Sequence, residues 1–149
     1  MAIGNTKIDN LLRRVKLLNE TVAWLKSFDG TTKSQIIEWI QKDQLTQKGV
    51  DKYGNVIGYY SLLTQSISRG KKKFNTHYTL FDTGDFYRSM AVLVFQNSIT
   101  IDGDTRKMED RKWYSNAILG LTDENFTKLK EIVKNSYIDY ARKTLQIGA

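Results

Sequence analysis

Residues 80–101 read LFDTGDFYRSMAVLVFQNSITI, and this stretch decides the fold. Its second half holds two runs of β-branched, aliphatic and aromatic residues, 90–95 and 99–101, which fit the pleated surface of a sheet. The intervening Gln96-Asn97-Ser98 is a turn sequence, so the stretch predicts an antiparallel hairpin. The first run is almost continuously apolar, which indicates burial on both faces, one against helices and the other against a partner.

Upstream, a long helix is predicted over residues 5–27. Its apolar residues recur at alternating spacings of three and four, with charged residues between them, which is typical of a heptad seam. They are Ile8, Leu11, Val15, Leu18, Val22 and Leu25. Because a confident coiled coil needs about three to four heptads, we expect this seam to pack on the chain's own core. A contact between subunits is the alternative.

Two further helices are expected. One follows a break and a hydroxyl cap at Thr31-Thr32, and it ends at Lys48-Gly49, where glycine takes the left-handed conformation. Its buried face consists of Ile36, Ile37, Ile40 and either Gln44 or Leu45. The other begins at the N-cap Thr122, and its apolar stripe is Phe126, Leu129, Ile132, Val133, Tyr137, Tyr140, Ala141 and Leu145. Helices with one small sheet predict an α+β fold in a single domain, residues 1–149.

Composition limits the chemistry. The 149 residues include no cysteine and one histidine, His77, which removes disulfides, thiolate chemistry and most histidine-based metal sites within one subunit. No phosphate-binding glycine loop or nucleophile elbow occurs. No apolar run approaches the roughly 18 residues of a membrane span, so neither secretion nor membrane insertion is expected. We expect a protein that is not an enzyme and that holds no cofactor and no metal.

Catalysis would have to rest on carboxylates, lysine, tyrosine or hydroxyls. A metal-dependent hydrolase using Asp82, Asp85, Asp102 or Asp104 is the third reading of this sequence. The four acids of residues 102–112 are matched by four cations, however, which favours a solvated surface. Between Asp82 and Asp85 we expect Thr83 to cap a short helical turn and Gly84 to permit a close backbone approach.

A basic loop is the other candidate site. The chain has 23 Lys and Arg against 16 Asp and Glu, a net charge of +7, and four cations gather within residues 69–73. They are Arg69, Lys71, Lys72 and Lys73. With Phe74, His77 and Tyr78 just after them, they form a candidate contact for DNA or an acidic partner, without sequence readout. A sequence-independent nucleic-acid-binding protein is therefore the alternative function, and a solvated loop is the plainer interpretation of the cluster.

Residues 80–90 and the apolar run behind them resemble the L-x-x-T-G-x-L/F-x-x-S-hydrophobic signature of tail-completion and head–tail joining proteins of tailed double-stranded DNA phages. The matched positions are Leu80, Thr83, Gly84, Phe86, Ser89 and Met90. Segments 44–61 and 118–122 resemble small virion proteins of phages that infect Bacteroidota.

The resemblance implies a non-enzymatic virion subunit, assembled in the host cytoplasm as a homo-oligomeric ring. Such a ring joins the portal to the tail and contacts other neck, portal or tail proteins. In it, the basic loop would either line a channel that carries DNA or dock on an acidic neighbour. Each copy in a ring needs two unlike patches. We expect one patch at the N-terminal seam, with Trp24 and Trp39, and the other at the hairpin, with Trp113 and Tyr114, because aromatic residues anchor interfaces.

Overall fold

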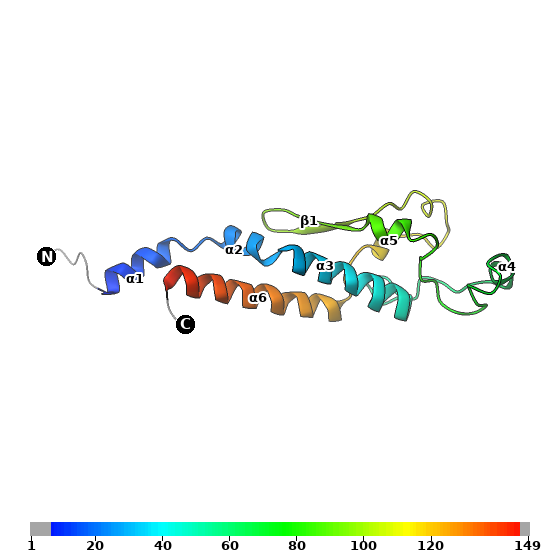
Figure 1. Cartoon of the computed structure of the whole chain (residues 1–149), viewed down its shortest axis with the longest axis horizontal. Coiled ribbons are helices and arrows are strands. Elements are labelled where there is room, and N and C mark those ends of the chain that lie inside the picture. The colour runs from blue at the N-terminus through cyan, green and yellow to red at the C-terminus, as the bar shows by residue number, and fades with distance from the viewer. Residues whose placement is uncertain (1–6, 147–149) are drawn as a thin grey trace.

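The computed structural model describes residues 7–146. Most helices run along the long axis of an elongated molecule, the hairpin lies along one side, and a short helix projects at one end (Figure 1). The predicted mixture of helices and a small antiparallel sheet is confirmed. The elements are α1 (Lys7–Lys16), α2 (Glu20–Ser27), α3 (Gly30–Glu38), the π-helix η1 (Trp39–Lys48), α4 (Leu62–Ile67), α5 (Asp85–Ser89), β1 (Ala91–Val94), β2 (Ile99–Asp102), the 3₁₀ turn η2 (Asn116–Ile118) and α6 (Asp123–Leu145).

The prediction of one long N-terminal helix is wrong. α1 stops at Lys16, and Asn19 begins a new helix because its side-chain oxygen accepts a hydrogen bond from the Val22 amide at 3.2 Å. An asparagine that caps a helix competes with continuation of the same helix through it. Residues 5 and 6 of the predicted helix lie outside the described part of the chain.

The seam does not pack on the core as we expected. Its members Ile8, Leu11, Val15, Val22 and Leu25 are all exposed, and no residue of α1 is buried. α1 and α2 lie against α6 (Figure 1), and α2 buries Ala23 and Ser27 there instead.

α3 and η1 supply much of the core. The N-cap is Asp29, whose carboxylate accepts from the Thr32 amide at 2.8 Å, rather than the predicted threonine hydroxyls. The helix ends at Gly49 with φ 62°, as predicted. From Trp39 onward it is a π-helix, which forms i→i+5 bonds. Both Gln44 and Leu45 are buried, where the sequence pattern predicted one of them.

The predicted hairpin is confirmed, with Val92 opposite Ile101 and Val94 opposite Ile99. Only one face of it is covered within the chain, where Val92 packs into the core beside α3, and Leu93 on the other face is exposed. The core is formed by Phe28, Ile36, Ile40, Leu45, Phe86, Met90, Val92, Ile118 and Leu129.

α6 begins at the predicted N-cap, Thr122, whose hydroxyl accepts from the Asn125 amide at 3.4 Å. Leu129 is buried and Val133 packs against the core, but Phe126 and Tyr137 of the predicted stripe are exposed. Among residues 7–146, no helix combines the length and the apolar content needed to cross a bilayer.

Candidate functional site

Residues 58–79 form a projection from the body, which we call the arm. Its base is an extended pair of segments, in which the Tyr60 amide donates to Thr76 and the Tyr78 amide donates to Gly58, at 2.9 and 2.8 Å. α4 closes the outer end and projects beyond the other elements (Figure 1). The His77 ring ties the arm to the body, since its Nε2 lies 3.0 Å from the Gln47 carbonyl oxygen.

The predicted basic loop lies on this arm and is ordered by hydrogen bonds. The Gly70 amide donates to Gln65 at 2.9 Å, and the Lys72 amide donates to the Ser68 hydroxyl at 2.9 Å. Among the described residues, Lys72 alone of the four cations has an acidic partner, Asp82 at 3.6 Å. The loop therefore holds like charges close together with little neutralisation by the protein itself.

Two adjoining hollows, of about 560 and 970 Å³, lie beside the arm, and we call them together the arm cleft. They share five lining residues: Tyr60, Thr64, Lys72, Phe81 and Asp82. The larger hollow is lined by all four predicted cations, and the smaller one reaches Arg111 and the loop after β2. The shared lining makes the cleft one continuous surface from the basic loop to the body.

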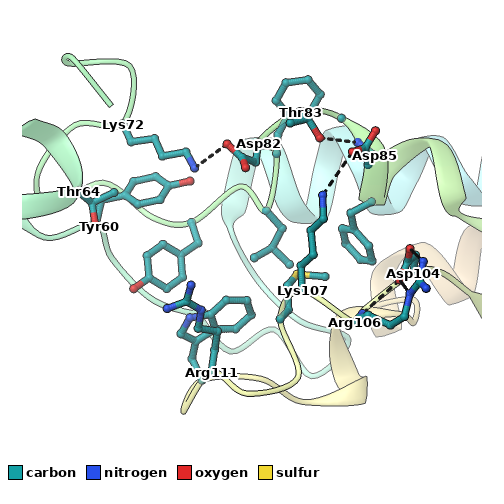
Figure 2. A pocket seen from close by; sticks show the side chains of 17 residues that line it. Tyr60, Thr64, Lys72, Asp82, Thr83, Asp85, Asp104, Arg106, Lys107 and Arg111 are labelled. Atoms are coloured by element: carbon teal, nitrogen blue, oxygen red, sulfur yellow. Dashed lines mark hydrogen bonds and ion pairs between the residues drawn. The ribbon is translucent and has the colours of Figure 1, made fainter. Parts of the chain in front are cut away.

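Aromatic rings line this surface (Figure 2). Tyr78 lies between Tyr60 and Trp113, with centroid distances of 4.9 and 5.5 Å. Phe81 stands edge to face with Tyr87 at 5.2 Å, and 51% of it remains exposed. Lys72 lies 5.7 Å from the Tyr60 ring centroid, within cation–π range. The cleft thus combines aromatic rings, which stack on planar groups, with cations, which pair with anions. This composition suits a ligand that carries both planar groups and negative charge.

Each carboxylate of the cleft has a cation of the same chain as its partner (Figure 2). The pairs are Lys72 with Asp82, Arg88 and Lys107 with Asp85, and Arg106 with Asp104, with nitrogen–oxygen distances of 2.5 to 3.6 Å. A hydrogen bond from Arg106 lowers the pKa of Asp104 to about 2. Hydrogen bonding with Thr83, and then with Arg88, lowers the pKa of Asp85. Both shifts favour the ionised form, so Asp85 and Asp104 present negative charge to the cations around the cleft.

Residues 7–146 contain no group of three or more His, Cys, Asp or Glu side chains placed to hold a metal ion. Asp102, the remaining acid of the hydrolase reading, does not line the arm cleft.

The phage-like motif builds the wall between the cleft and the core. Gly84 has φ 88°, which glycine adopts without strain, and it is the N-cap of α5. Thr83 was predicted to cap this turn, and that prediction is wrong: Thr83 precedes the cap, and its hydroxyl accepts from the Asp85 amide at 3.4 Å. Phe86 and Met90 are buried in the core, and Leu80 lines the cleft. The Ser89 hydroxyl donates to Phe86 and accepts from the Asp104 amide at 2.8 Å, which fixes α5 against the segment after β2.

The four aromatic residues predicted at subunit interfaces are half-buried, and they make contacts within the chain. The Trp24 indole donates to the Phe95 carbonyl oxygen at 2.8 Å, and Trp39 packs against the core. Trp113 lies against Tyr78, and the Tyr114 hydroxyl donates to Asn116 at 2.7 Å. Their part in an interface stays a prediction, because the most exposed apolar side chains lie elsewhere.

Two groups of exposed apolar side chains lie on or next to α1 and α4. These two helices occupy opposite ends of the molecule (Figure 1). The first, which we call the α1 face, consists of Ile8, Leu11, Leu12, Val15 and Leu17. The second, which we call the α4 tip, consists of Leu62, Leu63 and Ile67, each more than 60% exposed. Soluble monomers rarely expose groups of this kind, so the two ends are candidate contact surfaces.

Sequence reasoning missed the cleft as a unit, because its walls come from segments around residues 60, 80 and 110 that fold together. One signal was nevertheless present. Residues 52–81 contain five of the 23 cations and none of the 16 acids, so five of the seven excess positive charges lie in this stretch. Comparison with family models, with curated proteins and with solved structures finds no match to this chain.

Proposed function

We propose that the chain is a structural virion protein of a tailed phage, a ring-forming head–tail connector or tail-completion subunit that joins portal and tail. The resemblance of residues 80–90 to the head–tail joining signature supports this class. The observation that carries the proposal is the pair of unlike apolar surfaces, the α1 face and the α4 tip, at opposite ends of an elongated subunit.

Unlike surfaces suit the geometry of the proposed assembly. A ring joins each subunit to the next through two different patches, and a symmetric dimer uses one patch twice. Burying an exposed Leu or Ile contributes about 1.5–3 kcal/mol, so the three side chains of the α4 tip would contribute roughly 5–9 kcal/mol before the cost of association. That is enough to make subunit contact depend on these residues.

Sedimentation velocity of the purified chain over a range of concentrations tests this proposal. We expect wild type to assemble, and we expect Leu12→Glu on the α1 face and Leu63→Glu on the α4 tip to weaken assembly at least tenfold. Gln47→Glu is the matched control, because it adds the same charge at an exposed position outside both surfaces. A wild-type chain that stays monomeric at every concentration, or absence of the chain from purified tailed particles that encode it, would contradict the proposal.

A further inference from the structure

The positive charge of the arm favours binding of an anionic partner. The arm lies within the acid-free stretch 52–81 and carries four of its five cations. Of these four, Arg69, Lys71 and Lys73 have no acidic partner among the described residues. Hydrogen bonds fix the main chain of the loop, so the residues that carry these cations stay close together even when their side chains move. A polyanion with closely spaced charges would relieve this repulsion and release its own counterions.

The one ion pair of the loop can exchange. Lys72 contacts Asp82 at 3.6 Å, and the Asp82 side chain is 84% exposed. The Lys72 side chain is 30% exposed, but water screens the open Asp82 side of the pair, so a phosphate can take the place of the Asp82 carboxylate beside Lys72 at small cost. The Asp82 carboxylate meanwhile faces the same cleft and repels an anion.

The aromatic walls distinguish between kinds of polyanion. Phe81 lines both hollows, one side of it is supported by Tyr87, and half of its surface is open. A base stacked on such a ring contributes about 1–3 kcal/mol whatever its identity. In a duplex the base faces are already stacked on one another, so a duplex gains nothing from this wall. An acidic polypeptide would contact the loop cations, but it would not stack on the Phe81 ring unless it also carried aromatic residues.

We infer that the arm cleft binds single-stranded nucleic acid without sequence preference, with phosphates on the loop cations and a base against Phe81. The charge of the loop and the open ring of Phe81 are independent observations, and they converge on one surface. The site does not depend on assembly, because every residue it uses belongs to one chain.

Fluorescence anisotropy with an end-labelled 20-nucleotide oligothymidine tests the inference. Four phosphate contacts predict a slope of log affinity against log salt of about −3, from about −0.7 for each contact with a single strand. We expect the double variant Lys71→Ala/Lys73→Ala to make that slope shallower by about 1.4. Lys130→Ala/Lys134→Ala on α6 is the control, because it removes the same charge far from the cleft and should leave the slope unchanged.

Two single variants separate the parts of the site. Phe81→Leu keeps an apolar side chain but removes the ring, and we expect affinity to fall by about 5- to 100-fold. Asp82→Asn removes the repelling carboxylate and keeps its size, and we expect affinity to rise by about threefold, the scale of an exposed ion pair. A rise in affinity is opposite to the loss expected when the cleft is disrupted, so Asp82→Asn with an unchanged unfolding midpoint tests the site even if Phe81→Leu is unstable.

Several results would overturn the inference. One is that the oligothymidine does not bind in about 50 mM salt, where phosphate contacts are strongest. Another is that a folded Phe81→Leu variant binds it as tightly as wild type. The third is that a duplex of the same length binds with equal affinity. Polyglutamate that competes as well as the oligonucleotide would instead assign the arm to an acidic protein surface. Leu12→Glu, at the other end of the molecule, should bind as wild type does, so failure of the proposed assembly and failure of this site are distinguishable.

Discussion

Gln44 offers the sharpest test of how the body of the molecule is held together. It lies in the π-helix η1, its side chain is fully buried, and it connects η1 to the start of α6. Its amide nitrogen donates to the Gly120 carbonyl oxygen at 2.7 Å. Its amide oxygen accepts from the Thr122 amide at 2.9 Å and from the Asn125 side chain at 3.0 Å.

Replacing Gln44 with Met keeps the length and apolar stem of the side chain and removes all three hydrogen bonds. Asn125 keeps a second partner, because its amide nitrogen also donates to Asp43 at 2.9 Å. The Gly120 carbonyl and the Thr122 amide are left without this partner. An unsatisfied buried polar group costs about 1–3 kcal/mol, so we expect Gln44→Met to lower the free energy of unfolding by about 2–5 kcal/mol.

Urea unfolding followed by tryptophan fluorescence measures this loss. With a slope of about 2 kcal/mol per molar urea, the midpoint should fall by about 1–2.5 M. Gln47→Met is the matched control, since it makes the same change on the same helix at an exposed position, where substitutions usually cost less than about 0.5 kcal/mol. Gln41→Met should fall between the two, because its amide nitrogen loses half-buried bonds to the Tyr87 carbonyl oxygen and, more weakly, to the Met90 sulfur. If Gln44→Met costs no more than Gln47→Met, the junction is not held by this side chain.

Two further predictions concern a glycine and an acid. Gly49→Ala should cost more than about 2 kcal/mol, because the position has φ 62° and the new Cβ would lie 2.4 Å from Nδ1 of His77. Gly54→Ala is the control, because its φ is 80° and the space around it is open, so it should lose stability through backbone strain alone. If both variants lose the same free energy of unfolding in urea, the His77 contact has no role. The pKa of Asp104 is about 2, below its ordinary value, so its contribution to stability is present above about pH 4 and is lost as the pH falls toward 2. Asp104→Asn should therefore be less stable than wild type at about pH 6 and equal to it at about pH 2, and a difference in unfolding midpoint that persists in acid would contradict this.

Local signals in the sequence predicted the elements that depend on local chemistry. The β-branched runs on both sides of residues 96–98 predicted the hairpin, and Gly49 and Thr122 marked helix ends where they occur. The break at Asn19 was missed because the spacing of apolar residues runs through it, and a side-chain cap was not weighed against that spacing. The π-helix was missed because the apolar spacing that predicted a helix over these residues does not distinguish i→i+5 from i→i+4 bonds.

The candidate site was predicted in part. The loop cations and the motif residues from Leu80 to Met90 were named from the sequence, and the structure brings Lys72, Leu80 and Thr83 to one cleft. The stacking of Tyr60, Tyr78 and Trp113 could not be predicted, because it joins the arm to a distant loop. The α1 face could not be predicted as an exposed surface. The periodicity of its apolar residues indicates a helix with one apolar side, but it does not say whether that side packs on the core or stays exposed.

The central claim is that the two ends of the subunit are unlike surfaces that bind each other. Sedimentation velocity of an equimolar mixture of Leu12→Glu and Leu63→Glu tests it most directly. Each variant retains the surface that the other lacks, so we expect each to be monomeric alone and the mixture to form a dimer. A mixture that stays monomeric while wild type assembles would contradict the claim.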